Sequence, residues 1–235
     1  MKNNSIDKHL LAEKILAAHQ KEGLAPHIRF LISIHALVSL GEKSLLNLVT
    51  DMALNNGVTI EHIREILLQT HLFCGFPRTI NGFAVLHRCL SQRDGRASQP
   101  VKALREKRPS RAWRKRGEGL FKVIYQKNHS DVLASLKSFH PDLAEWILND
   151  AYGKVLSREG LEAKNRELAA IGTLTVLKVF PQLLSHIKGG LHLGANREEV
   201  KEAIRQMELY TSRETVIRGL RLLATGTCNV EPYQE

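Results

Sequence analysis

The sequence predicts an all-α protein made of two homologous helical-bundle modules in tandem. The two halves of the 235-residue chain align without a gap at an offset of 137 residues, with 15 identities between residues 29–86 and their counterparts. A constant register over that length is typical of an internal repeat. Apolar residues recur at helical spacing, and no strand-like alternation of useful length is found. Because there are only two copies, we expect them to pack as an internal pseudo-dimer.

The helices of the second half can be placed in order. A first helix is predicted over 162–179, which has no proline and a single glycine. Pro181 suits the first turn of a second helix, which Gly194 ends in the left-handed conformation that favours glycine. Asn196, followed three residues later by an acidic residue, predicts a capping box and a third helix over 197–210.

The first half repeats this plan, with Thr59 as the cap of its third helix. Residues 128–160, a bridge that leads into the helices of the second half, predict two further helices, one capped by Ser130 and one opened by Pro141. Trp146 and Tyr152 belong to an apolar stripe on the second of these helices. We therefore interpret both aromatic residues as packing residues.

Net charge is unevenly distributed along the chain. Of the formal +10, residues 93–127 carry +9, whereas 1–92 carry +2 and 128–235 carry −1. These bounds divide the chain into a first module, a basic connector that is partly helical over 101–107, and a second module. The most basic stretch, 92–119, has one aromatic residue and no groove-reading motif, so nucleic acid is not favoured as a partner.

Composition excludes several other classes of protein. No apolar run reaches the roughly 18 residues of a membrane helix, and the N-terminal residues lack the apolar stretch of a signal peptide. We therefore expect a soluble, cytoplasmic protein with no membrane partner. Cys74, Cys89 and Cys228 are too few and too far apart for a disulfide scaffold or a CxxC pair. The 11 histidines form no convincing ligand cluster, so neither a metal nor a cofactor is predicted.

Three stretches of the chain carry a recognisable pattern. They are RELAAIGTLTVLKVFPQLLSHIKGGLHLGANREEVKEAI in the second module, ALNNGVTIEHIREILLQTHLFCGFPRTINGF in the first, and HPDLAEWILNDAYGKVLSREGL between them. Together they resemble the carboxymuconolactone decarboxylase family, which includes the alkylhydroperoxidase D proteins. The resemblance covers roughly residues 25–90 and 139–225. It implies an all-α fold of the alkylhydroperoxidase D-like type and a homo-oligomer, with a trimer of two-module chains favoured.

The resemblance implies two alternative chemistries. The peroxidase branch of the family uses a Glu, a CxxC pair and a later His, and the Glu and His map onto Glu167 and His186. The two cysteine positions are occupied by Val179 and Gln182. A thiol peroxidase needs a nucleophilic and a resolving thiol, so this activity is disfavoured. Residual peroxidase activity through another cysteine is kept as a third hypothesis.

The decarboxylase branch needs no thiol. Loss of carbon dioxide from a lactone acid leaves negative charge that a conjugated carbonyl must take up, so the site needs a proton donor or acceptor and groups that stabilise charge. Glu167 can orient the imidazole of His186, which leaves the other ring nitrogen to exchange a proton with substrate. Gln182, one turn earlier on the same helix face, can hydrogen-bond the substrate. Arg166 can bind a substrate carboxylate.

The first module cannot repeat this acid–base pair, because the corresponding positions hold Phe30, Leu45 and Val49. We therefore expect one site per chain. The favoured hypothesis is a cofactor-independent lyase that acts on a small anionic lactone or a related carbonyl acid. The alternative from another class is a non-catalytic oligomeric binding or scaffold protein.

Overall fold

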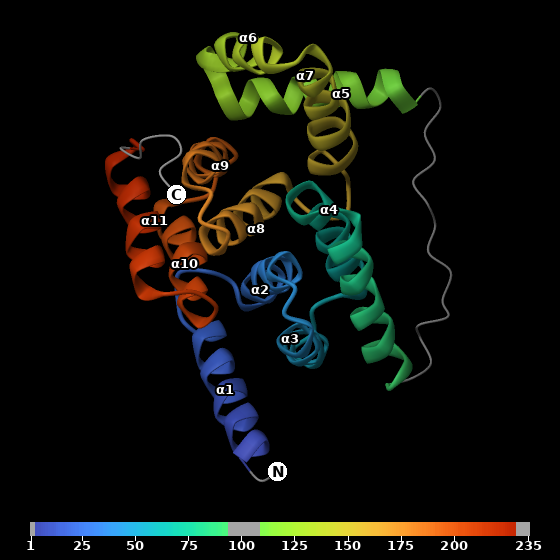
Figure 1. Ribbon diagram of the computed structural model, residues 1–235, viewed down its shortest axis with the longest axis vertical. Helices are drawn as coiled ribbons and strands as arrows, with labels where there is room; N and C mark the ends of the chain where they lie inside the picture. Colours follow the sequence, from blue (N-terminus) through green and yellow to red (C-terminus); the bar gives the residue numbers. More distant parts are fainter. Residues whose placement is uncertain (1–2, 94–108, 229–235) are drawn as a thin grey trace.

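The computed structural model describes residues 3–93 and 109–228, and every regular element within these ranges is a helix (Figure 1). This confirms the all-α prediction. The elements before the gap are α1 (Asn3–His19), α2 (Pro26–Leu40), α3 (Lys43–Asn55) and α4 (Ile60–Ser91). Those after it are α5 (Pro109–Tyr125), η2 (Gln126–Asn128), α6 (His129–Phe139), α7 (Pro141–Trp146), the π-helix η3 (Ile147–Leu156), α8 (Ala163–Val176), α9 (Phe180–His192), α10 (Arg197–Arg205), η4 (Gln206–Leu209) and α11 (Arg213–Thr225).

The two modules have corresponding helices at the predicted offset. Helices α2, α3 and α4 of the first module correspond to α8, α9 and the α10–α11 pair of the second. Helices α2 and α8 pack against each other at the centre, with α3 and α4 on one side and α9 to α11 on the other (Figure 1). The apolar core runs continuously through both modules. This arrangement is the internal pseudo-dimer that the repeat predicts.

Local signals place most helix ends where the sequence predicts them. The Thr59 hydroxyl accepts a hydrogen bond from the backbone N–H of His62, and Asn196 forms a full capping box with Glu199. Gly194 has φ of +92°, the left-handed conformation. The predicted cap at Ser130 is wrong, because α6 begins one residue earlier and no side chain caps it.

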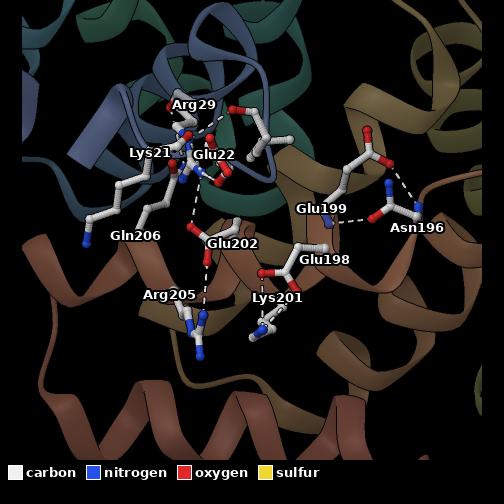
Figure 2. A network of polar contacts seen from close by, with 11 residues as sticks. Lys21, Glu22, Arg29, Asn196, Glu198, Glu199, Lys201, Glu202, Arg205 and Gln206 are labelled. Carbon is white, nitrogen blue, oxygen red and sulfur yellow. Dashed lines mark hydrogen bonds and ion pairs between the residues drawn. The ribbon is translucent and has the colours of Figure 1, made fainter. Parts of the chain in front are cut away.

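Two reciprocal ion pairs join the modules across the centre. Arg29 Nη2 lies 3.0 Å from Glu202 Oε2, and Arg166 Nη2 lies 2.7 Å from Glu65 Oε2. Each pair combines an arginine of one module with a glutamate of the other, and the two pairs are related by the 137-residue offset. Figure 2 shows the first pair, with Arg29 and Arg205 on opposite sides of Glu202. Both arginines of these pairs, Arg29 and Arg166, are buried, so the pairs fix how the modules meet.

Part of the predicted basic connector is a packed helix. Residues 94–108, which include the helical stretch predicted over 101–107, lie outside the described residues. Residues 109–125 of the predicted connector form α5. This helix packs against η3 and α9 over a second apolar cluster that contains Phe121, Ile124 and Leu148. Helix α5 and its neighbours thus cover one end of the second module.

The two aromatic residues of the predicted stripe have different surroundings. Tyr152 is 6% exposed and belongs to the cluster under α5, so it is a packing residue as predicted. Trp146 is 64% exposed, so the same prediction is wrong for this residue. The backbone switches from α7 to the π-helix η3 directly after Trp146, and the wider π turn changes which side chains share a face. Across the described ranges, no helix is both long and apolar enough to cross a membrane.

Candidate active site

Glu167 and His186 meet between two neighbouring helices of the second module. Glu167 lies in the first half of α8 and His186 in the middle of α9, and these helices pack side by side. The Nδ1 atom of His186 lies 2.7 Å from Glu167 Oε2. The Glu167 side chain is 2% exposed, whereas the His186 side chain keeps 16% of its surface open. The pair therefore has a buried carboxylate behind a partly accessible imidazole.

The carboxylate determines the charge of the imidazole. Burial alone would lower the pKa of His186, but the charge of Glu167 and its hydrogen bond outweigh burial and raise that pKa above its usual 6.5. The carboxylate accepts the Nδ1–H hydrogen bond, so the other ring nitrogen, Nε2, is the one left to transfer a proton.

Helix α5 closes the site from one side. A Cβ atom on Gly189 of α9 would lie 3.1 Å from Glu167 Oε2 and 3.0 Å from Cγ2 of Ile124. A side chain at this position would separate the three groups, so the glycine lets α5 and the carboxylate approach α9 closely. On another side Phe73 of α4, a residue of the first module, lies with its ring centre 5.9 Å from that of His186.

Two tyrosines lie near the buried carboxylate. The hydroxyl groups of Tyr125 and Tyr152 are 3.0 Å apart and form a hydrogen bond between α5 and η3. Burial raises the pKa of both hydroxyls, and the negative charge of Glu167 adds to the shift. They therefore stay protonated, and because one hydroxyl donates to the other, the pair has one O–H left to donate. Sequence reasoning missed them as site residues, because no spacing pattern connects them with Glu167.

A second histidine also contacts Phe73. His35 of α2 is fully buried, its Nδ1 is 2.5 Å from the Thr173 hydroxyl, and its Nε2 has no hydrogen-bond partner among the described residues. Its ring meets Phe73 edge-on with ring centres 5.0 Å apart. Burial, together with the charges of His186 and Arg166, lowers the pKa of His35 to about 3. This neutral histidine was also missed, since it comes from the first module.

The two predicted substrate-binding residues have different outcomes. Gln182 lies exposed at the start of α9, one turn before His186, and the structure gives it no hydrogen bond to the pair. Arg166 is 0% exposed and donates hydrogen bonds to Glu65 and to the backbone oxygen of Leu161. The predicted role of Arg166 as a substrate ligand is therefore corrected: its guanidinium is buried and already hydrogen-bonded within the protein.

Comparison with known proteins agrees with this architecture. The sequence profile described as the carboxymuconolactone decarboxylase family matches two segments, residues 10–88 and 141–224. The chain belongs to the carboxymuconolactone decarboxylase family. The first matched segment covers α2, α3 and most of α4, and the second covers α8 to α10 and most of α11, so each module carries one family-domain match.

Relatives within the carboxymuconolactone decarboxylase family carry different names. Peroxisomal protein 2 of Schizosaccharomyces pombe is 35% identical over 157 residues, which cover 66% of this chain and 71% of the relative. A 4-carboxymuconolactone decarboxylase of Acinetobacter baylyi is 32% identical over 88 residues, 37% of this chain and 66% of that enzyme. Nitrosuccinic acid decarboxylase of Metarhizium robertsii is 28% identical over 78 residues, 33% of this chain and 52% of that enzyme. The relatives thus support decarboxylase-like ancestry without fixing a substrate.

The first family domain has an apolar version of the same site. Phe30 and Val49, which replace Glu167 and His186, are 1% and 0% exposed. His19 stacks on Phe30 with ring centres 4.3 Å apart, and its Nε2 lies 3.1 Å from the hydroxyl of Ser33. The first domain is therefore packed shut at the positions where the second holds its acid–base pair.

The family's thiol chemistry has no counterpart among the described residues. Cys74 and Cys228 are half-buried and Cys89 is buried, and all three are free thiols. Burial raises the pKa of the Cys89 thiol, and the nearby Asp51 raises it further, so the reactive thiolate is suppressed there. Within residues 3–93 and 109–228, no group of three or more His, Cys, Asp or Glu side chains could hold a metal ion.

Proposed function

We propose that this protein is a decarboxylase-type lyase that acts on a small anionic lactone or carbonyl acid at Glu167 and His186. The observation that carries the proposal is the 2.7 Å contact between the buried Glu167 carboxylate and the partly exposed His186 imidazole. Two relatives named as decarboxylases support the reaction class. No step of the proposed chemistry requires a thiol.

The proposed reaction begins with an ionised substrate carboxylate beside the imidazolium of His186. The bond from the carboxylate carbon to the adjacent carbon breaks and carbon dioxide leaves. The electron pair moves into the conjugated carbonyl of a lactone acid as an enolate, or into the nitro group of nitrosuccinate as a nitronate. His186 then donates its Nε2 proton to the substrate carbon and becomes neutral, and solvent returns the proton. Glu167 exchanges no proton with the substrate in this scheme, and its charge favours the protonated form of His186 before the reaction.

Other side chains have supporting roles in this proposal. The protonated pair of Tyr125 and Tyr152 places one free O–H near Glu167, where it can stabilise developing negative charge on the substrate. Gln182 remains the proposed substrate contact at the exposed end of the site. The substrate carboxylate is neutralised by His186, since Arg166 is already paired with Glu65.

The test is an assay of carboxymuconolactone and nitrosuccinate turnover by the wild-type chain and by His186→Ala and Glu167→Gln. We expect carbon dioxide release from one of these acids, and a loss of about 10²-fold or more in kcat in His186→Ala, since positioned proton donors contribute roughly 10² to 10⁴. Lys188→Ala is the matched control, because Lys188 is exposed on the same helix. Unchanged turnover in both site variants would contradict the assignment of the pair.

A non-catalytic scaffold is the second candidate function. The observation that favours it is the near-complete burial of Glu167 beneath α5 and α9. Turnover of neither acid by the well-folded chain would support this candidate over the lyase. The disfavoured thiol peroxidase is tested separately: peroxide turnover that persists after Ser replaces all three cysteines would eliminate it.

We further propose that the chain assembles as a homo-oligomer in the cytoplasm, with a trimer favoured. Phe76 and Ile80 lie one turn apart on α4 and are 67% and 65% exposed, which supports a contact with another copy. Light scattering at assay concentration measures the assembly, and a monomer would contradict it. Imaging of a tagged chain distinguishes the cytoplasm from the compartment in the name of the S. pombe relative.

A further inference from the structure

A cavity of about 700 Å³ lies between α1 and the α10–α11 pair. None of the residues that line it belongs to the Glu167–His186 pair or to the groups around that pair. An inference about this cavity is therefore independent of the proposed decarboxylase activity.

The rim of this cavity gathers positive charge. Lys14, Lys21, Arg205 and Arg213 all line it. Arg205 lies 3.2 Å from Glu202, but that carboxylate is already held by the buried Arg29 on its other side (Figure 2). For the other three cations, the described part of the chain supplies no ion-pair partner.

Not all of these positive side chains are neutralised by lining acids. Among the described residues, Glu208 is the one lining acid besides Glu202, so the described lining carries a net positive charge. A concave cationic surface concentrates anions.

Part of the cavity lining is apolar. Val216, Ile217 and Leu220 of α11 line it, and Ile217 is 41% exposed although it lies inside a concave surface. An exposed branched side chain beside a guanidinium group suits a ligand that has an apolar part as well as a charged head.

The other module provides an internal comparison. At the 137-residue offset, Arg205 and Arg213 correspond to Leu68 and Phe76. The same fold is therefore built without these two cations in the other module, so packing does not require them. Their presence on one side only points to a ligand rather than to the scaffold.

We propose that this cavity binds a small amphipathic carboxylate. The guanidinium groups of Arg205 and Arg213 bind the carboxylate of the ligand, because the planar guanidinium of an arginine can donate two parallel hydrogen bonds to the two carboxylate oxygens. The aliphatic part of the ligand lies along Ile217 and Leu220. The lysines at the rim neutralise the remaining charge and attract the anion.

The test measures binding of octanoate to the full chain by calorimetry, with acetate and octan-1-ol as probes that lack the tail or the charge. We expect octanoate to bind at least 10-fold more tightly than either. In the double variant Arg205→Leu and Arg213→Phe, which introduces the residues of the other module, octanoate affinity falls at least 10-fold. Arg221→Leu is the control, since Arg221 lies on α11 outside the cavity.

Three results would overturn the proposal. Octanol binding as tight as octanoate would exclude a charged head, and equal affinity in the double variant would place octanoate elsewhere. Failure of the folded chain to bind octanoate would contradict the proposed carboxylate site. Circular dichroism of the double variant verifies folding, and the single variant Arg213→Phe repeats the measurement with one exposed residue changed.

Discussion

Two histidines near one phenylalanine have opposite electrostatics. His186 has a carboxylate within hydrogen-bond distance, so its pKa is raised although burial opposes the charge. His35 is buried without an acidic partner, and its pKa is lowered to about 3. A proton donor for an anionic substrate must be charged before the reaction, and only His186 meets that condition near neutral pH.

This difference predicts the pH dependence of activity. Because proposed turnover requires the imidazolium of His186, kcat/KM falls as the pH rises through the raised pKa of this group. In Glu167→Gln the carboxylate is lost while burial remains, so the fall occurs at lower pH. NMR of the imidazole nitrogens checks the assignment: His186 titrates above pH 6.5, and His35 shows no titration between pH 8 and 5. Identical pH profiles for both proteins would contradict the role of Glu167.

The sequence predicts the Glu167–His186 pair because both residues lie in one contiguous family pattern. It does not predict His35, which reaches the neighbourhood from the other module through the α2–α8 packing. Arg166 was misassigned for a related reason. Its partner, Glu65, is about 100 residues away in the chain, and no local spacing shows that the pair forms.

At the scale of elements, the covering helix α5 depends on two glycines where it crosses η3. A Cβ atom on Gly117 would lie 1.9 Å from the backbone oxygen of Leu148, and one on Gly153 would lie 2.1 Å from that of Trp113. Both contacts are with backbone, which cannot rotate away. The two helices therefore touch directly, and this contact holds α5 against the site.

We expect Gly117→Ala to push α5 away from η3 and to lower the free energy of unfolding by about 2 kcal/mol or more, as overpacking typically does. Gly119→Ala is a matched control on the same helix, since nothing lies within 4 Å of its Cβ position. There alanine is the better helix former and raises stability by about 0.5–1 kcal/mol. Chemical denaturation of both variants measures the difference, and equal stabilities would contradict direct helix contact.

Helix ends were predictable where the signal is local, as with the capping box at Asn196 and the left-handed Gly194. The packed role of α5 was not predictable from composition. Its basic residues are typical of a solvated linker, and only Phe121, Ile124 and neighbouring apolar residues form the buried face. The structure shows that this face is buried because it packs against η3.

For the whole molecule, the reciprocal ion pairs join two domains of unequal chemistry into one unit. The sequence repeat shows that the arginine and the glutamate occur at matching positions in both halves. It does not show that each arginine pairs with the glutamate of the other half. Only the packing of α2 against α8 brings the swapped partners together. The apolar first domain thereby supports the second domain, which holds the acid–base pair.

Removing one of these glutamates should weaken the whole molecule. We expect Glu65→Ala to cost about 3–5 kcal/mol at pH 7, because Arg166 stays buried without its partner. Burial alone would raise the pKa of Glu65, but hydrogen bonds from Arg158 and Arg166 lower it below its usual 4.5. Because the pKa of Glu65 is lower in the folded protein than in the unfolded chain, its ionisation stabilises the fold above about pH 4.5. This stabilisation is lost as the pH falls through the pKa of Glu65 in the folded protein.

The penalty of Glu65→Ala should therefore shrink in acid, as the wild-type protein loses the same ion pair. Urea unfolding from pH 7 to pH 3 measures this convergence. Glu61→Ala is the control one turn earlier on α4, where the side chain is 73% exposed and 4.0 Å from Arg64, and it should change stability by no more than about 0.5 kcal/mol. A pH-independent penalty would show that Glu65 acts through packing rather than charge, because deleting buried atoms costs the same whether or not the carboxyl is ionised.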